Sequence, residues 1–136
     1  MPQDWECYLA KSKECLRSAQ SACGRGLNNC AANRAYYAAY LAELAALQKL
    51  SSISLPEAGW QHPMVVKAFN HRLVRVKKVF DAKIVQQVTY LESLRIKADY
   101  KIETVSGTEA TECYTIAREI VNQIERVLTA KAEKGK

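Results

Sequence analysis

The sequence predicts an all-α protein, an up-and-down antiparallel bundle of four main helices plus one short helix. Its 136 residues are 49% apolar and 25% charged, which is the ordinary composition of one globular domain. Apolar residues recur at three- and four-residue spacing along several long segments, which short turn-forming stretches separate. Residues 79–88 have some β-branched character, but they merge into a helical stripe. We therefore expect a single helical domain over residues 1–136.

Residues 33–47 predict the central helix of this bundle. The segment is rich in alanine and leucine and contains no glycine, proline or β-branched residue. Apolar residues cover it nearly all round: Cys30, Tyr37, Leu41, Ala45, Tyr36, Ala39, Tyr40, Leu44 and Leu47. Such a helix must be covered on several sides, so it should form the core. Arg34 lies close to its buried side and therefore needs an acid, a phosphate or an opening to water.

The first helix is expected to run from about Asp4 to Cys23 on the outside of the bundle. Its apolar residues at helical spacing are Trp5, Leu9, Leu16, Ala19 and Cys23. Gly24 and Gly26 are natural stops after it, and Asn28 or Asn29 can cap the central helix. So short a connection predicts that the two helices are antiparallel neighbours.

A short third helix is expected after the central one. The central helix should end near Leu50, because residues 51–56 combine hydroxyl, β-branched and proline residues. A loop follows to about His62, and Pro63 suits the first turn of a helix. The residues that could face the core are Val65, Phe69 and Leu73. The most basic region of the chain is also here, with Lys67, Arg72, Arg75, Lys77 and Lys78; it is either a solvated face or a footprint for RNA.

The fourth helix places a charge on its packed face. Its apolar stripe consists of Ile84, Val88, Leu91 and Ala98, and Arg95 falls in the same stripe. Asp99 lies four residues after Arg95, within reach of an ion pair on a helix surface, and Tyr100 follows at once. Arg95 and Asp99, with Arg34, either form a buried network that fixes helix packing or hold a phosphate.

The fifth helix is long and amphipathic. The residues from Ser106 to Glu109 have the pattern of a capping box at its start. Its apolar face consists of Ala110, Cys113, Ala117, Ile120, Ile124 and Leu128. Residues 131–136 are charged and contain glycine, so we expect them to fray.

Charge and cysteine content narrow the class of protein without naming its function. The net charge of +6 and a pI near 9.1 permit binding to nucleic acid or to an acidic partner, and are also ordinary for a soluble protein. The first residues lack the regions of a signal peptide and no apolar run is of membrane length, so we expect a cytoplasmic protein. The five cysteines lack metal-ligand spacing, which predicts reduced packing thiols and neither metal nor cofactor.

Two strings together resemble the HEPN superfamily of small prokaryotic helical proteins. They are residues 33–40 (NRAYYAAY) and residues 95–100 (RIKADY), and the likeness covers nearly the whole chain. The resemblance implies an up-and-down helical bundle that commonly dimerises and is often encoded with a minimal nucleotidyltransferase as a toxin–antitoxin pair. It also implies a metal-independent ribonuclease in many members, whose active site uses an arginine followed four to six residues later by a histidine.

This chain departs from that motif, because neither His62 nor His71 follows an arginine at that spacing. The candidate catalytic residues are Arg95, Asp99, Tyr100 and Arg34, which the resemblance implies lie around a dimer cleft. The arginines could stabilise phosphate charge, whereas Asp99 beside Arg95 should have a lowered pKa and be a poor acid. Two functions stay open. One is a homodimeric RNA-binding protein or metal-independent RNA endonuclease; the other is a non-catalytic module that docks a nucleotidyltransferase-like partner or RNA.

Overall fold

The computed structural model describes residues 2–51 and 61–130, and within these ranges its regular structure is entirely helical. The elements are α1 (Asp4–Gly24), α2 (Asn28–Leu50), α3 (His62–Phe69), the π-helix η1 (Asn70–Val76), α4 (Lys83–Tyr100) and α5 (Gly107–Leu128). The prediction of four main helices and one short helix is therefore confirmed. No helix in the described part of the chain is long and apolar enough to cross a membrane.

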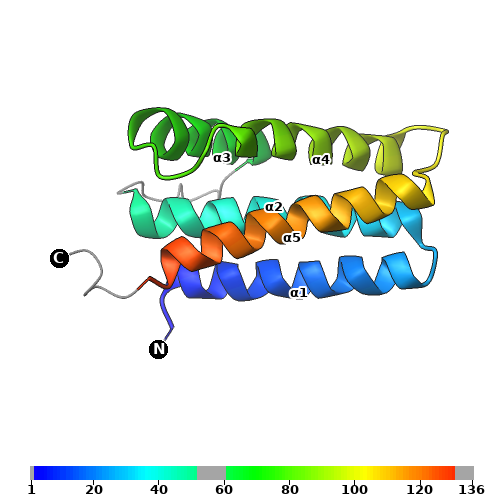
Figure 1. The fold of residues 1–136 in the computed structure, drawn as a ribbon, viewed down its shortest axis with the longest axis horizontal. Coiled ribbons are helices and arrows are strands. Elements are labelled where there is room, and N and C mark those ends of the chain that lie inside the picture. The colour runs from blue at the N-terminus through cyan, green and yellow to red at the C-terminus, as the bar shows by residue number, and fades with distance from the viewer. Residues whose placement is uncertain (1, 52–60, 131–136) are drawn as a thin grey trace.

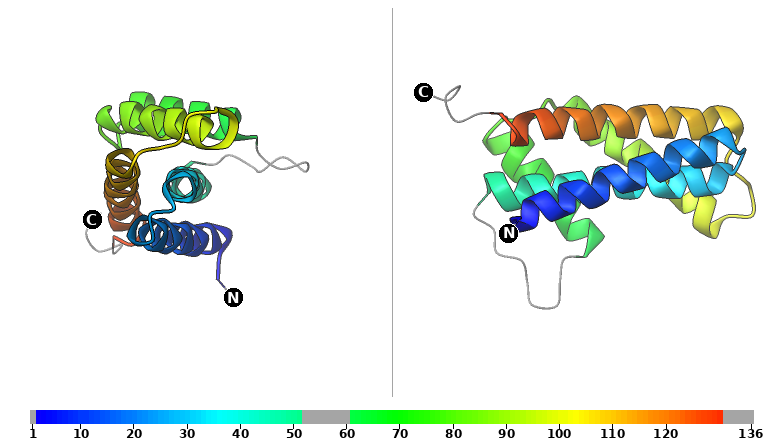
Figure 2. Two further views of the ribbon diagram at one scale, coloured as in Figure 1. Left: turned by 90° about the vertical axis from the view of Figure 1, so that its right-hand side faces the viewer. Right: turned by 90° about the horizontal axis from the view of Figure 1, so that it is seen from below.

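The four long helices alternate in direction, so that α1 and α4 run one way along the bundle and α2 and α5 run the other way (Figure 1). Viewed along the bundle, α2 has α1 on one side, α5 on a second and the layer of α3 and α4 on a third (Figure 2). It packs against all four of these helices. The prediction that α2 forms the core is therefore confirmed.

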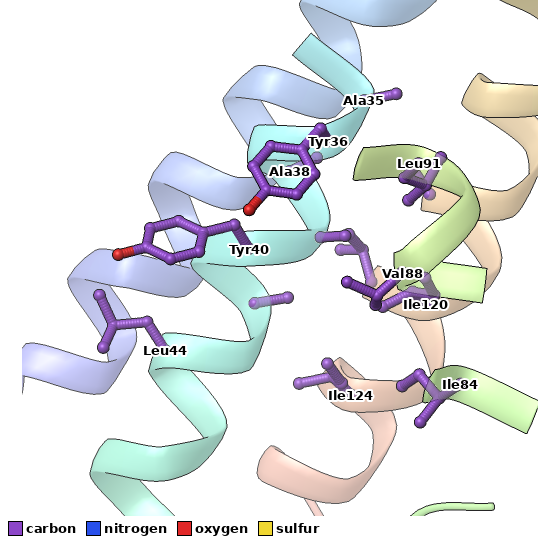
Figure 3. Close-up of a cluster of buried hydrophobic side chains, with 14 of the residues drawn as sticks. Ala35, Tyr36, Ala38, Tyr40, Leu44, Ile84, Val88, Leu91, Ile120 and Ile124 are labelled. Atoms are coloured by element: carbon purple, nitrogen blue, oxygen red, sulfur yellow. The ribbon is translucent and has the colours of Figure 1, made fainter. Parts of the chain in front are cut away.

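The core is built from alanines and tyrosines of α2 against aliphatic residues of α4 and α5. Figure 3 shows Tyr36 and Leu44 of α2 in the same cluster as Val88 of α4 and Ile120 of α5. The fully buried alanines of α2 are Ala31, Ala32, Ala35, Ala38, Ala39, Ala42, Ala45 and Ala46. Such small side chains let neighbouring helices come close, and each larger aliphatic residue buried between them contributes about 1.5–3 kcal/mol.

The turn between α1 and α2 corrects one prediction about capping. Gly26 adopts a φ of +72°, which favours glycine, and the chain turns there as expected. However, the residue before α2 is Leu27, and no side chain caps the helix. The Oδ1 atom of Asn29 instead accepts a hydrogen bond from the backbone of Val105 at 2.9 Å. Asn29 therefore ties this turn to the loop between α4 and α5, a long-range role that local sequence cannot reveal.

The third helix is less regular than the sequence predicted. Pro63 lies in the first turn of α3, as expected. The predicted core residues Val65, Phe69 and Leu73 are all fully buried. Beyond Phe69 the helix continues into η1, which ends with a backbone hydrogen bond from Lys77 to the carbonyl of Arg72 at 3.0 Å. The loop that follows folds back without forming a strand.

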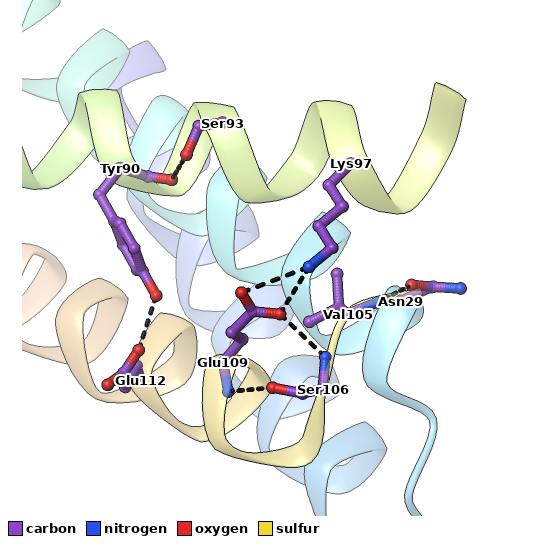
Figure 4. A network of polar contacts seen from close by, with 8 residues as sticks. All are labelled: Asn29, Tyr90, Ser93, Lys97, Val105, Ser106, Glu109 and Glu112. Carbon is purple, nitrogen blue, oxygen red and sulfur yellow. Dashed lines mark hydrogen bonds and ion pairs between the residues drawn. The ribbon is translucent and has the colours of Figure 1, made fainter. Parts of the chain in front are cut away.

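The start of α5 is held by the predicted capping box, which is confirmed (Figure 4). The hydroxyl of Ser106 accepts a hydrogen bond from the backbone of Glu109 at 3.1 Å, and the Glu109 carboxylate accepts one from the backbone of Ser106 at 3.0 Å. Lys97 adds an ion pair with Glu109 at 3.0 Å, which joins the end of α4 to the start of α5. All six apolar residues predicted for the inner face of α5 are buried. Residues 131–136, expected to fray, lie outside the described residues.

Candidate functional site

Arg95 of α4 lies against a group of tyrosines. Its guanidinium carbon is 4.9 Å from the centroid of the Tyr36 ring, 6.0 Å from that of Tyr37 and 5.9 Å from that of Tyr100. Its Nη1 atom is 3.5 Å from Oδ2 of Asp99, so the predicted ion pair is present. Only 13% of the Arg95 side chain is exposed, against 28% for Asp99. Aromatic faces attract a cation, and they stabilise the Arg95 charge where water cannot reach it freely.

Asp99 connects α4 to α2 through Asn33. The Nδ2 atom of Asn33 donates hydrogen bonds to both carboxylate oxygens of Asp99, at 3.1 and 3.3 Å. The Oδ1 atom of Asn33 accepts two hydrogen bonds from Arg34, from Nη2 at 2.7 Å and from Nε at 2.9 Å. Three of the four predicted site residues, Arg34, Asp99 and Arg95, are thus joined in one network. Asn33, which joins them, was not among the predicted site residues, although it begins the NRAYYAAY string.

Arg34 makes three side-chain hydrogen bonds, and none of them is to an acid. Besides Asn33 it contacts the Sγ atom of Cys15 at 3.8 Å, and its guanidinium carbon is 5.3 Å from the centroid of the Tyr37 ring. Within the described residues it forms no ion pair. It lines two surface hollows of about 310 and 330 Å³, one shared with Asp99 and the other with Cys15. The sequence required an acid, a phosphate or an opening to water beside Arg34, and the structure provides the opening to water.

His62 lies at the same site, although the sequence had separated it from Arg95. Its ring centroid is 4.3 Å from that of Tyr40, 5.2 Å from that of Tyr37 and 5.9 Å from that of Tyr36. Partial burial lowers the pKa of His62, and the positive charge of Arg95 lowers it further. His62 is therefore neutral at pH 7 and able to accept a proton.

Tyr100 marks the open side of the site. It is the last residue of α4 and is 74% exposed, although it lies close to Arg95. Ile96, one turn before it, is also exposed, and Ile102 just after it is 99% exposed. The end of α4 therefore presents apolar side chains to solvent directly beside a cationic site.

Glu43 of α2 is a buried acid that the sequence analysis did not single out. Its exposure is 0%, and neither carboxylate oxygen has a hydrogen-bond partner among the described residues. Burial raises the pKa of Glu43 well above its ordinary value, because a buried carboxylate without a partner favours the protonated form. The ring of Tyr36 lies against Arg95, and its hydroxyl is likewise buried without a hydrogen-bond partner in the described ranges. A lone glutamate in an alanine-rich helix is typical of a solvent-facing position, which is why no local signal revealed it.

The cysteines do not form a second site. Cys113 is buried in the core, and burial raises the pKa of its thiol to about 12, which makes it unreactive at neutral pH. Burial also raises the pKa of Cys15, although the neighbouring Arg34 charge opposes this effect. In residues 2–51 and 61–130 no group of three or more His, Cys, Asp or Glu side chains is arranged to hold a metal ion.

Fold and site together define a small helical-bundle protein that holds an arginine–aspartate pair and a histidine against tyrosines, where α2 meets α3 and α4. The chain belongs to the HEPN domain family, whose model matches residues 5–127. Comparison with curated protein sequences gives no match.

Two solved structures share the fold. One is TT1696 from Thermus thermophilus, with a TM-score of 0.73 and 19% identity over 90% of this chain and 96% of that one. The other is ST0689, an archaeal HEPN homologue, with a TM-score of 0.69 and 19% identity over 94% of this chain and all of that one. At this level of identity the two structures support the fold and carry no information about activity.

Proposed function

We propose that this protein is a cytoplasmic RNA-binding HEPN protein that cleaves RNA without a metal ion and acts as a homodimeric toxin–antitoxin component. The observation that carries the proposal is that His62 and Arg95 pack against the same two tyrosines, Tyr36 and Tyr37. The family motif obtains an arginine and a histidine from one stretch of sequence. Here the histidine comes from α3 and the arginine from α4, and the fold brings both against the same tyrosines.

The chemistry assigns a separate role to each group. Neutral His62 takes the proton of an RNA 2′-hydroxyl, and the 2′-oxygen then attacks the adjacent phosphorus. The 5′-oxygen leaves and takes a proton from water at the open side of the site, beside Tyr100. The products are a 2′,3′-cyclic phosphate and a 5′-hydroxyl end. Arg95 and Arg34 stabilise the negative charge that builds on the phosphate, and Asp99 holds Arg95 in position.

Dimerisation is supported by the exposed apolar residues beside the site. Ile96, Tyr100 and Ile102 are exposed at the end of α4. Pairing of this end about a two-fold axis would cover them and bring two Arg95 sites to one cleft, as the family resemblance implies. The two sites would then face a single RNA strand.

The test compares His62→Gln with His71→Gln in the presence of chelator. The two histidines are the only ones in the chain, and His71 is exposed on η1. Purified protein is incubated with end-labelled single-stranded RNA, and cyclic phosphate ends are measured. We expect His62→Gln and Arg95→Ala to lower the cleavage rate at least about a hundredfold, whereas His71→Gln leaves it unchanged. Full activity in His62→Gln would refute the assigned role.

A second candidate is a non-catalytic module that docks a nucleotidyltransferase-like partner. It is favoured by the ion pair itself, since Asp99 neutralises the charge with which Arg95 would hold a phosphate. Absence of cleavage by the wild-type protein, together with stable co-purification with a nucleotidyltransferase encoded beside it, would select this candidate.

A further inference from the structure

A second cationic surface lies at the other end of α4 from Tyr100. Residues 67–83 contain six basic residues and one acidic residue, Asp81, in a chain whose net charge is +6. The basic residues are Lys67, Arg72, Arg75, Lys77, Lys78 and Lys83. We call this surface the basic tip. It lies at the end of the bundle where α2 and α5 finish (Figure 1), about 18 Å along α4 from Arg95.

The basic tip is held on a fixed scaffold. The backbone NH groups of Val79 and Phe80 both donate to the carbonyl of Leu73, at 2.8 and 3.2 Å. The ring of Phe80 stacks on that of Phe69, with centroids 5.2 Å apart. Lys77 donates through Nζ to the carbonyl of Leu50 at 2.9 Å, which fastens the loop to the end of α2. The other basic side chains of the tip therefore project from a backbone that is already ordered.

These charges are not neutralised within the described part of the chain. Lys67, Arg72, Arg75 and Lys78 are exposed, and none lies within ion-pair distance of a described carboxylate. The one acid among them accepts a hydrogen bond from the backbone of Lys83 at 2.8 Å, at the start of α4. Like charges gathered on one surface repel each other, and a polyanion relieves that repulsion.

A hollow of about 660 Å³ opens within the basic tip. It is lined by Val74, Arg75, Lys78, Val79, Phe80, Asp81 and Ala82. Apolar side chains thus lie beside two cations, Arg75 and Lys78. Single-stranded nucleic acids bind surfaces of this composition, because the cations hold the phosphates while apolar or aromatic groups contact the bases. An acidic protein helix would need the charges but not the hollow.

We propose that the basic tip is a docking surface for single-stranded RNA, separate from the Arg95 site. This proposal rests on the proposed function for the identity of the ligand, RNA. It adds a second place on the protein, away from the site of cleavage, where the strand is held. Lys67 and Arg75 lie eight residues apart along α3 and η1 and both are exposed, so they can contact different phosphates of one strand.

The test measures the affinity of a fluorescent 2′-O-methyl oligonucleotide, which lacks the free 2′-hydroxyl and is not cleaved. The double variant Arg75→Gln/Lys78→Gln is compared with Arg118→Gln/Arg126→Gln, which removes the same charge from exposed positions on α5. The Lys78→Gln change replaces one non-glycine residue by another at a backbone φ of +53°, so it adds no new strain. Anisotropy titrations at several salt concentrations give the dissociation constant and its salt dependence.

We expect the tip variant to bind about tenfold more weakly. The slope of log affinity against log salt should fall by about 1.4, since each lost contact to a single strand removes about 0.7. The α5 variant should bind like wild type. Equal affinities for the two variants, whether both unchanged or both weakened, would overturn the proposal. If both variants bind the oligonucleotide like wild type, the charges of the basic tip would suit an acidic protein instead of RNA.

The outcome is independent of catalysis. Cleavage fails with His62→Gln and Arg95→Ala if the proposed function is right, whereas docking is measured on a strand that cannot be cleaved. If the wild-type protein does not cleave RNA and the tip variant still loses binding, RNA docking is supported and only the proposed cleavage is refuted.

Discussion

The guanidinium of Arg95 lies over the ring of Tyr36, 4.9 Å from its centroid, and so joins α4 to the central helix. The same ring lies 5.9 Å from that of His62 on α3. A single buried tyrosine thus sets the position of a cation and of a proton acceptor that are far apart in the sequence. The site therefore depends on the integrity of the core, and its variants are expected to change stability as well as activity.

Arg95→Ala should destabilise the protein by about 2–3 kcal/mol. The change removes the contact with the tyrosines and leaves the partly buried Asp99 without its cation. Arg118→Ala is the matched control, because Arg118 also lies over a tyrosine ring, that of Tyr114 at 5.4 Å, but is exposed. That change should cost less than about 0.5 kcal/mol. Urea denaturation measures both, and equal midpoints would show that the Arg95 network contributes nothing to stability.

Asp99→Asn should separate the structural role of the pair from its role in binding. Asparagine can still accept a hydrogen bond from Asn33 but no longer neutralises Arg95. We expect a loss of about 1 kcal/mol in stability and a rise of about threefold in affinity for the 2′-O-methyl oligonucleotide. Chemical denaturation and anisotropy measure the two effects. Weaker binding would mean that Asp99 matters more for orienting Arg95 than for cancelling its charge.

Glu43→Gln should remove a dependence of stability on pH. Burial raises the pKa of Glu43 in the folded state above its unfolded value, so the protonated form is the one that folding favours. The contribution of Glu43 to stability is then greatest below the unfolded pKa, near 4.3, and falls by up to about 1.4 kcal/mol per pH unit as pH rises from there toward the folded pKa.

Denaturation midpoints of the Glu43 variant between pH 4.5 and pH 8 test this. We expect Glu43→Gln to be flatter than wild type over that range, while Glu14→Gln, at an exposed position, follows wild type. Parallel curves for all three proteins would show that Glu43 reaches water in the folded state.

The cleavage rate should rise with pH, with a midpoint below the ordinary pKa of histidine, which is near 6.5. The base acts in its neutral form, and burial with the Arg95 charge lowers the pKa of His62. Single-turnover rates between pH 4.5 and pH 8 give the profile. Arg95→Lys should preserve the low midpoint because the positive charge remains. A midpoint above 6.5 in the wild type would contradict this environment for His62.

The protein should be a homodimer that pairs through the end of α4. Light scattering at micromolar concentration should give twice the mass of 15.3 kDa. Ile96→Glu/Ile102→Glu places charges on the exposed apolar residues beside the site and should yield monomers. Val76→Glu, at a position 61% exposed on η1, should stay dimeric. A monomeric wild type, or a dimer that survives the double change, would exclude this surface.

The helices could be predicted because their signals are local. Alanine and leucine in residues 33–47, the glycines after α1 and the capping box at Ser106 act within one or two turns of chain. Spacing alone also placed Arg95 on a packed face with Asp99 in reach, since the geometry of one helix determines which residues share a side. The strings of residues 33–40 and 95–100 were sufficient to predict the family.

Only the tertiary structure decided how these parts meet. His62 and Arg95 lie at one site because α3 and α4 pack on the same tyrosines of α2, and no spacing in the sequence encodes that arrangement. Asn33 reaches Asp99, Asn29 reaches Val105 instead of capping α2, and Glu43 is buried for the same reason. Each depends on which face of a helix its neighbours cover. That choice is made by the packing of side chains distant in sequence, so a local pattern shows that a residue is charged or apolar but not what it touches.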